Sequence, residues 1–363
     1  MEEVSVRTLV AGLAFLAGIV FGATAQKTHF CTMGAISDMV VMEDFRRFRS
    51  WLLAIAVAMV LSQAMWSAGL INLDASIYRT ANLGWAGAIL GGLMFGFGMT
   101  LAGGCGNKTL VRIGGGNLKS IVVFMIVGVT AYMTLRGLIA LARIELESAT
   151  NVDLGVPQGL DALLGGITGI PAGGLRPVLT AIVAGAILWW CFKDAAFRES
   201  RKDVAAGIII GLMVPVGWYI TGVAGNDDFE PTPLFSFTFI APIGESLQYL
   251  MTFTGSSINF GIASVGGIIT GAFLMALATG TFRVEAFTGT RDMLGNMAGA
   301  VLMGAGGVLA LGCTIGQGLT GLSTLAVGSA LAFLSILAGG FYGIKYQEEG
   351  TFGGALRASL SRG

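Results

Sequence analysis

The chain has 363 residues, of which 54% are hydrophobic and 12% are charged, and its mean hydropathy is +0.79. Soluble domains carry about 25% charged residues, so this composition excludes an ordinary soluble protein and indicates helices that cross a membrane several times. The 21 basic and 21 acidic residues leave no net charge, so nothing points to a nucleic-acid partner. The 57 glycines are about twice the usual share of ~7%, and small residues let membrane helices approach each other closely.

Nine apolar stretches are long enough for a bilayer, which takes about 20 mostly apolar residues to cross. We expect spans at 8–26, 50–71, 84–102, 118–142, 177–193, 204–223, 258–280, 295–312 and 324–344. The first is expected to be a membrane helix and not a cleaved signal peptide, because it is long and follows the acidic Glu2 and Glu3. Two interrupted apolar segments, 157–174 and 237–253, are expected to form interfacial or re-entrant helices. The sequence therefore predicts an all-α polytopic membrane protein, with residues 1–363 forming a single transmembrane transport domain.

The basic residues predict the orientation of these spans. With nine spans, sixteen of the 21 lysines and arginines fall on one side of the membrane, and Arg136 falls inside the fourth span. The opposite side takes Arg7, Arg79, Arg143 and Arg176. Because cytoplasmic loops are the ones enriched in Lys and Arg, we expect the N-terminus outside and the C-terminus in the cytoplasm.

A glycine stands nine residues before each of three cysteines. The pairs are Gly22 with Cys31, Gly96 with Cys105, and Gly304 with Cys313. The segments "GFGMTLAGGC" (96–105) and "GAGGVLALGC" (304–313) share more than the glycines, which favours an internal repeat over glycine packing alone. The predicted spans before Cys105 and Cys313 run in opposite directions. We therefore expect two pseudo-symmetric inverted halves, about 1–150 with Cys31 and Cys105 and about 177–345 with Cys313.

Polar, glycine-rich segments surround two of these cysteines, at 104–116 and 312–321. They are too polar for lipid and too short to span, so we expect short re-entrant helices whose N-terminal N–H groups face a pore and favour anions. The candidate binding residues are Gly104, Cys105, Asn107 and Lys108 in the first segment and Gly312, Cys313, Thr314 and Gln317 in the second. Lys108, Arg112 and Arg283 are candidate cations near the inner mouth, although simple cytoplasmic anchoring explains them equally well.

The default role of a membrane cysteine is that of a small buried hydrophobe, and we keep this role for Cys191. Cys31, Cys105 and Cys313 are different because each follows an apolar span at the same distance from a glycine. A thiol is a weak donor and a polarisable acceptor, and a pathway needs several weak sites. Three thiols therefore suit the passage of a sulfur-bearing solute. We expect no metal, because transition metals recruit more ligands than this pattern offers, and no other cofactor.

The stretches "FCTMGA", "GFGMTLAGGCGNKTLVRIGGG" and "GAGGVLALGCTIGQGLTGLSTLAVGS" resemble the YeeE/YedE family of bacterial inner-membrane sulfur transporters. The resemblance implies thiosulfate uptake through an hourglass-shaped protein in the inner membrane. It also implies that Cys31, Cys105 and Cys313 relay the ion through S–H···S contacts, without covalent capture. The implied partners are thiosulfate, the lipid bilayer and a small cytoplasmic TusA-like (YeeD) sulfurtransferase.

Two alternatives remain open from the sequence. In the first alternative, the protein transports another sulfur or selenium compound. In the second, it is a membrane sulfurtransferase in which Cys105, three residues from Lys108, forms a persulfide. We expect a transporter and not an enzyme. The acids nearest the re-entrant segments are Asp38, Glu245, Glu285 and Asp292, for which an interfacial position is favoured over a proton relay.

Overall fold

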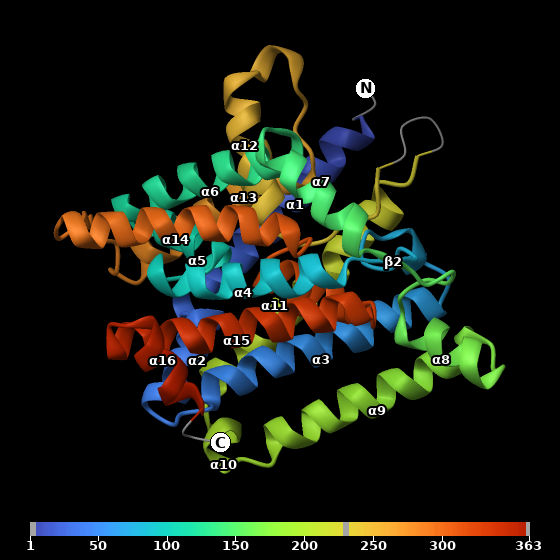
Figure 1. Cartoon of the computed structure of the whole chain (residues 1–363). Helices are drawn as coiled ribbons and strands as arrows, with labels where there is room; N and C mark the ends of the chain where they lie inside the picture. The colour runs from blue at the N-terminus through green and yellow to red at the C-terminus, as the bar shows by residue number, and fades with distance from the viewer. Residues whose placement is uncertain (1–4, 228–231, 361–363) are drawn as a thin grey trace.

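The computed structural model describes residues 5–227 and 232–360, and most of these residues are in helices (Figure 1). The α-helices of the first half of the chain are α1 (Val6–Thr28), α2 (Thr32–Val41), α3 (Arg46–Ser67), α4 (Trp85–Leu101), α5 (Gly106–Gly114), α6 (Leu118–Arg136), α7 (Ile139–Thr150) and α8 (Leu160–Thr168). Those of the second half are α9 (Ala172–Phe192), α10 (Ala195–Glu199), α11 (Arg201–Tyr219), α12 (Ile240–Met251), α13 (Phe260–Ala278), α14 (Thr290–Leu309), α15 (Val327–Glu349) and α16 (Phe352–Leu360). Glu2 and Glu3 lie outside the described residues.

Smaller elements complete the chain. Two 3₁₀ turns lie at Leu73–Ala75 and Phe253–Gly255, and two π-helical segments lie at Ile220–Ala224 and Gly316–Gly321. The strands β1 (Asn82–Leu83) and β2 (Val152–Asp153) pair antiparallel as a two-residue ladder.

Nine helices within the described ranges are long and apolar enough to cross a membrane. They are α1, α3, α4, α6, α9, α11, α13, α14 and α15. This confirms the all-α polytopic fold and the nine spans expected from hydropathy. The interrupted segments 157–174 and 237–253 contain the short helices α8 and α12.

The fourth span is shorter than expected. The prediction placed Arg136 inside a helix over 118–142, but α6 ends at Arg136 and the chain leaves the helix at Gly137, whose φ is −105° and ψ is −155°. A Cβ at Gly137 would lie 2.8 Å from the Cα of Met133, so this turn favours glycine. The charged side chain therefore belongs to the end of a span, and α7 is a separate helix.

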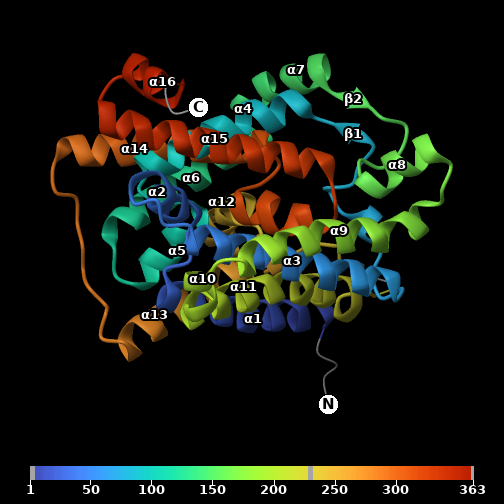
Figure 2. The same cartoon turned by 90° about the horizontal axis from the view of Figure 1, so that it is seen from below.

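The helix packing has an internal correspondence. The helix α1 packs closely on α13, and α11 packs closely on α3. In the same way, α4 packs on α15 and α14 packs on α6. Each of these pairs joins a helix of the first half of the chain to one of the second half. Exchanging α1 with α11, α3 with α13, α4 with α14, and α6 with α15 maps these contacts onto one another. Figure 2 shows α1, α11 and α3 side by side. The first set of helices is therefore α1, α3, α4 and α6, and the second set is α11, α13, α14 and α15. The span α9 lies between the two sets along the chain. Because successive spans alternate in direction, this additional span makes corresponding helices run antiparallel.

The molecule has two ends that can be followed in both views (Figures 1 and 2). One end carries α8, β1 and β2, and we call it the α8 end; the other carries α2 and α16, and we call it the α2 end.

The glycines nine residues before the cysteines lie at the helix contacts. A Cβ at Gly22 would overlap the carbonyl oxygen of Ile268 in α13, and a Cβ at Gly96 would overlap that of Ile336 in α15. At Gly304 a Cβ would lie 2.8 Å from the carbonyl oxygen of Val127 in α6. Each glycine thus lets the span before a cysteine touch the backbone of its partner helix.

Candidate functional site

Each of the three cysteines stands at the start of a short helix. Cys31 is the N-cap of α2 and Cys105 is the N-cap of α5, while Cys313 directly precedes a helix over residues 314–323 that includes the π-helical segment. The Cys313 Sγ accepts a hydrogen bond from the Gly316 N–H at 3.5 Å. The sulfurs of Cys31 and Cys105 lie near the N–H groups of Gly34 and Lys108, without a side-chain cap hydrogen bond. The expected short helices at 104–116 and 312–321 are therefore present, with a sulfur at each N-terminus.

The backbone before each cysteine repeats as well. The residue two positions earlier has a left-handed backbone in all three cases, with φ of 56° at His29, 69° at Gly103 and 55° at Leu311. The Gly104 N–H donates to the Met99 carbonyl at 2.8 Å, and the Gly312 N–H donates to the Gly307 carbonyl at 2.8 Å. This is the hydrogen bond with which many helices end before the chain turns. The turn directs the cysteine back into the protein.

The thiols follow one another through the core. Cys31 and Cys105 are in contact with each other, and the Thr314 hydroxyl lies beside the Cys105 thiol. Cys313 precedes Thr314 and lies beside the Thr238 hydroxyl. All three are buried free thiols. We call Cys31, Cys105, Thr314 and Cys313 the thiol row.

Cys191 lies apart from the thiol row. It packs with Leu53 and Phe197, and its Sγ donates to the Arg49 carbonyl at 3.4 Å. This agrees with the structural role expected for it.

Four buried side chains along the thiol row have a polar atom without a hydrogen-bond partner. These atoms are Thr32 Oγ1, Asn107 Oδ1, Thr314 Oγ1 and Gln317 Oε1. Buried polar atoms in native proteins nearly always have partners. The two threonine hydroxyls can donate a hydrogen bond to an anion, whereas the amide oxygens of Asn107 and Gln317 can only accept one.

Glycines make room for two candidate binding side chains. A Cβ at Gly104 would lie 2.9 Å from Cγ of Lys108, and a Cβ at Gly312 would lie 3.2 Å from Cγ of Gln317. The Gln317 amide donates to the Ala310 carbonyl, which fixes its direction. Both glycines of the Gly-Cys motifs thus allow a polar side chain to fold back over the motif.

The candidate cations do not all gather at the thiols. Lys108 interacts electrostatically with both Cys31 and Cys105, and no carboxylate in the described chain lies within ion-pair distance of its ammonium group. Arg112 points back to the turn at Gly103, where its Nη1 would lie 3.2 Å from an added Cβ. Arg283 is exposed in the segment after α13, and its N–H donates to the Gly115 carbonyl at 3.1 Å. Of these three candidate cations, Lys108 is the one that interacts with both Cys31 and Cys105.

The four candidate acids have partners of their own. Asp38 pairs with Arg47 at 2.9 Å and Asp292 with Lys119 at 2.7 Å. Glu285 accepts from Asn117 at 2.6 Å and Glu245 from Asn259 at 2.8 Å. Within the described residues, the partners of these four acids all lie outside the thiol row.

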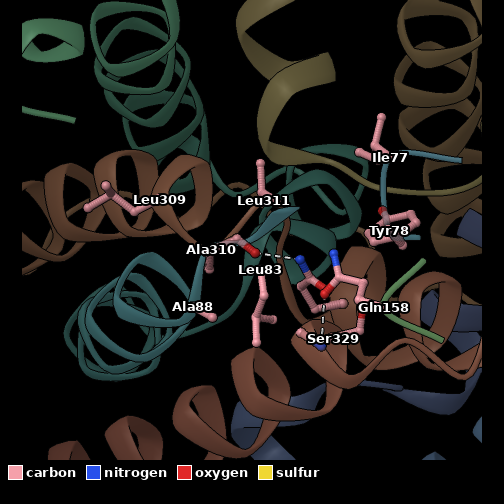
Figure 3. Close-up of a pocket in the computed structure, with 12 residues that line it drawn as sticks. Ile77, Tyr78, Leu83, Ala88, Gln158, Leu309, Ala310, Leu311 and Ser329 are labelled. Carbon is pink, nitrogen blue, oxygen red and sulfur yellow. Dashed lines mark hydrogen bonds between the residues drawn. The ribbon is translucent and has the colours of Figure 1, made fainter. Parts of the chain in front are cut away.

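Cavities lie toward both ends of the protein. At the α2 end, a cavity of about 630 Å³ is lined by His29, two residues before Cys31, together with Arg47 and Lys202. At the α8 end, a small pocket is lined by the exposed Leu311 and by the buried Gln317 and Tyr78. Figure 3 shows Leu311 and Tyr78 in this lining.

Sequence reasoning missed several residues at the thiol row. Tyr78 and Thr238 lie beside Cys313 but belong to loops without a motif. Trp51 stacks between Phe30 and Phe333, with ring centroids 4.9 and 5.9 Å away, and its indole N–H has no partner. A buried tryptophan in an apolar span gives no signal in the sequence that it borders a site. In the described part of the chain, no cluster of His, Cys, Asp and Glu has the makings of a metal site.

Comparison with known proteins identifies the family. A family model described as sulphur transport matches residues 27–342, which is most of the chain. The chain belongs to the sulphur transport family. This confirms the family expected from the cysteine motifs, and with it the assignment to membrane transport and not to an enzyme class.

Two relatives within the sulphur transport family match most of the chain. The Thiosulfate transporter TsuA of Escherichia coli is 28% identical over 331 residues, which cover 86% of this chain and 86% of that protein. The Thiosulfate transporter TsuA of Spirochaeta thermophila is 28% identical over 337 residues, which cover 89% of this chain and 95% of that protein.

Proposed function

We propose that this protein takes up thiosulfate across a bacterial inner membrane and passes the ion along Cys313, Cys105 and Cys31 without forming a covalent bond. The observation that carries the proposal is the thiol row, in which three buried free thiols from different parts of the chain follow one another. Two relatives named thiosulfate transporters match nearly the whole chain and support the choice of solute.

The surroundings of the thiols suit both ends of thiosulfate. Its terminal sulfur is soft and fits a polarisable thiol. Its oxygens need hydrogen-bond donors, and these are N–H groups at the helix starts together with the Thr314 hydroxyl. The amide groups of Gln317 and Asn107 already donate to the Ala310 and Phe30 carbonyls. Lys108 balances part of the negative charge beside Cys31 and Cys105. Each contact is weak enough for the ion to move on.

The direction and the partner belong to the same proposal. The excess of basic residues in one set of loops supports an N-terminus outside and a C-terminus in the cytoplasm. On this orientation the α8 end is external, so the ion meets Cys313 first and leaves past Cys31 into the cavity beside His29. A small cytoplasmic TusA-like (YeeD) sulfurtransferase would then collect it at the α2 end.

Uptake of ³⁵S-thiosulfate into proteoliposomes tests the proposal. We expect Cys31→Ala, Cys105→Ala and Cys313→Ala each to lower the initial rate at least about tenfold, because each removes one stepping site from a single path. Cys191→Ala is the matched control and should retain the wild-type rate, since its thiol packs away from the row. Full uptake by the triple variant would contradict the relay.

The same preparation separates the alternatives. Sulfate, sulfite and selenite are added as competitors, and preferential competition by selenite would indicate a selenium solute. The protein is also incubated with thiosulfate, and the masses of its peptides are measured by mass spectrometry. A stable gain of one sulfur atom on Cys105 would indicate a membrane sulfurtransferase and contradict non-covalent passage.

A further inference from the structure

Tyr78 is a buried polar residue that the thiol row does not account for. Its side chain is 4% exposed, and its hydroxyl has no hydrogen-bond partner. The hydroxyl lies beside Thr238, and Tyr78 also interacts with the thiol of Cys313. Burial raises the pKa of Tyr78, so the phenol stays protonated and can donate a hydrogen bond.

A glycine keeps the space around this hydroxyl open. A Cβ added at Gly316 would overlap the Thr238 hydroxyl and would lie 3.4 Å from the Tyr78 hydroxyl. The N–H groups of Phe239, Ile315 and Gly316 converge on the Cys313 sulfur at the same place. A buried phenol hydroxyl without a hydrogen-bond partner lowers the stability of the fold. A phenylalanine at this position would pack equally well without that cost. Its hydroxyl is therefore placed for something that arrives at Cys313.

The pocket at the α8 end is lined by Tyr78 itself and has too little free space for an ion. Figure 3 shows Tyr78 across the pocket from Ala310. Gln317 also lines the pocket. The pocket has only about 20 Å³ of free space, roughly what one water molecule needs. A tetrahedral oxyanion is larger than water, so it reaches Cys313 only when a lining side chain moves.

The loop that carries Tyr78 is held in place by its neighbour. The Arg79 guanidinium is buried and binds Asp161 at 2.7 Å and the Thr324 carbonyl at 2.8 Å. Thr324 directly follows the helix over 314–323, so one side chain joins the Tyr78 loop, α8 and the end of the Cys313 helix. Because these contacts hold the backbone, the pocket can widen only if a lining side chain moves, and Tyr78 is the lining side chain that interacts with the Cys313 thiol.

We propose that Tyr78 is the gate at the α8-end entrance to Cys313, and that its hydroxyl donates a hydrogen bond to an oxygen of the entering sulfur oxyanion. The ring closes the pocket at rest and turns aside to admit the ion, and Arg79 is the positioning residue that holds the loop. The hydrogen bond orients the ion with its terminal sulfur toward the Cys313 thiol. The identity of the ion as thiosulfate rests on the proposed function, whereas the gate does not.

Kinetics of Tyr78→Phe test the hydrogen bond. This variant keeps the ring and removes only the hydroxyl, so in ³⁵S-thiosulfate uptake we expect KM to rise about tenfold with the maximal rate within twofold. Tyr219→Phe, on a side chain that is 49% exposed at the end of α11, is the control and should leave KM unchanged. An unchanged KM in Tyr78→Phe would overturn the assigned hydrogen bond.

Thiol labelling tests the gate independently of transport. Purified protein is treated with an anionic methanethiosulfonate reagent, and modification of Cys313 is followed by peptide mass spectrometry. We expect Tyr78→Ala to speed labelling of Cys313 at least about tenfold, with Tyr78→Phe and Tyr219→Ala at the wild-type rate. Equal rates in Tyr78→Ala and wild type would overturn the gate. If Tyr78→Ala does not fold, faster labelling in Arg79→Lys, which loosens the same loop, is the supporting result and an unchanged rate is the contrary one.

A wild-type protein that takes up no thiosulfate would refute the proposed function, while the labelling rates would still decide the gate.

Discussion

Cys31, Cys105 and Cys313 lie in one row because of the backbone two residues before each of them. His29, Gly103 and Leu311 all have a positive φ, although only one of the three is glycine. A bulky residue adopts this conformation at a cost of roughly 1–2 kcal/mol, so Leu311 is retained there by the tertiary structure. The turn ends one helix and begins the next, with the cysteine sulfur near the new helix's first N–H groups.

The charge of Lys108 is expected to contribute to thiosulfate binding beside the thiols. It is the cation that interacts with both Cys31 and Cys105, and it has no carboxylate partner in the described part of the chain. We expect Lys108→Gln to raise KM for thiosulfate about tenfold or more, because a hydrogen bond to a charged group contributes about 1.5–3 kcal/mol. Initial-rate uptake against thiosulfate concentration measures this effect.

Lys202→Gln is the control for Lys108. Lys202 is an exposed cation in the cavity at the α2 end, where salt screens its charge. Its removal should change KM less than twofold at 0.15 M salt. Equal effects of the two variants would mean that only the general charge of the α2 end matters.

At the scale of elements, glycine determines how closely the spans pack. The glycines nine residues before the cysteines each face the backbone of a partner helix: α1 meets α13, α4 meets α15 and α14 meets α6. The pattern that indicated a repeat is therefore also a packing pattern. For Gly96 and Gly304 the repeat and the packing agree, because α4 corresponds to α14 and α15 to α6, whereas Gly22 lies in α1, which corresponds to α11.

Gly96→Ala tests the contact between α4 and α15. The added methyl would overlap the Ile336 carbonyl, which belongs to the backbone and cannot turn aside. We expect a loss of about 1–3 kcal/mol in stability, as for other overpacked interiors. Thermal unfolding in detergent should show a midpoint lowered by several degrees.

Gly185→Ala in α9 is the matched control for Gly96→Ala. Nothing lies within 4 Å of a Cβ added at Gly185, so alanine should be neutral or slightly stabilising in this helix. The packing argument fails if both variants unfold at the same temperature.

At the scale of the whole molecule, the thiol row lies where the two sets of helices meet. Cys31 and Cys105 come from the first set and Cys313 from the second. The helix α12 corresponds to α2 in the packing, and its N-cap residue is Phe239, where α2 has Cys31. The Phe239 N–H nevertheless points to the Cys313 sulfur. The correspondence therefore extends to the packing of α12, but not to the backbone at its start, where ψ is −20° at Phe239 and 131° at Cys31.

Arg79 connects distant parts of the chain at the α8 end. Its side chain is 1% exposed and pairs with Asp161, which is 0% exposed, and with Asp74. We expect Arg79→Ala to cost about 3–5 kcal/mol, because the Asp161 charge loses its main partner in the interior. The thermal unfolding midpoint in detergent measures this loss.

Arg143→Ala provides the comparison for Arg79→Ala. Arg143 pairs with Glu147 at 2.7 Å nearer the surface, with side chains 19% and 30% exposed. Such pairs contribute about 0–1 kcal/mol, so its midpoint should move little. A similar small shift in both variants would contradict the structural role of the buried pair.

The sequence by itself determined the class of the protein, the nine spans and the three cysteines of interest. Hydropathy suffices for the spans, because the bilayer demands about 20 apolar residues wherever the chain crosses. It placed the end of the fourth span wrongly, since Gly137 stops the helix by a local conformation that an apolar average does not register. The Gly-Cys motifs indicated the short helices, because polar segments of that length cannot face lipid.

Only the tertiary structure decided which residues surround the thiols. Tyr78, Thr238 and Trp51 come from loops and spans without a motif, and they reach the site because helices distant in sequence pack together. Arg283 followed the same sequence rule as Lys108, yet it is exposed beyond α13 while Lys108 faces the thiols. Composition and residue spacing predict whether one segment lies in lipid, in water or in the protein interior. Proximity between segments depends on packing, which no single segment contains.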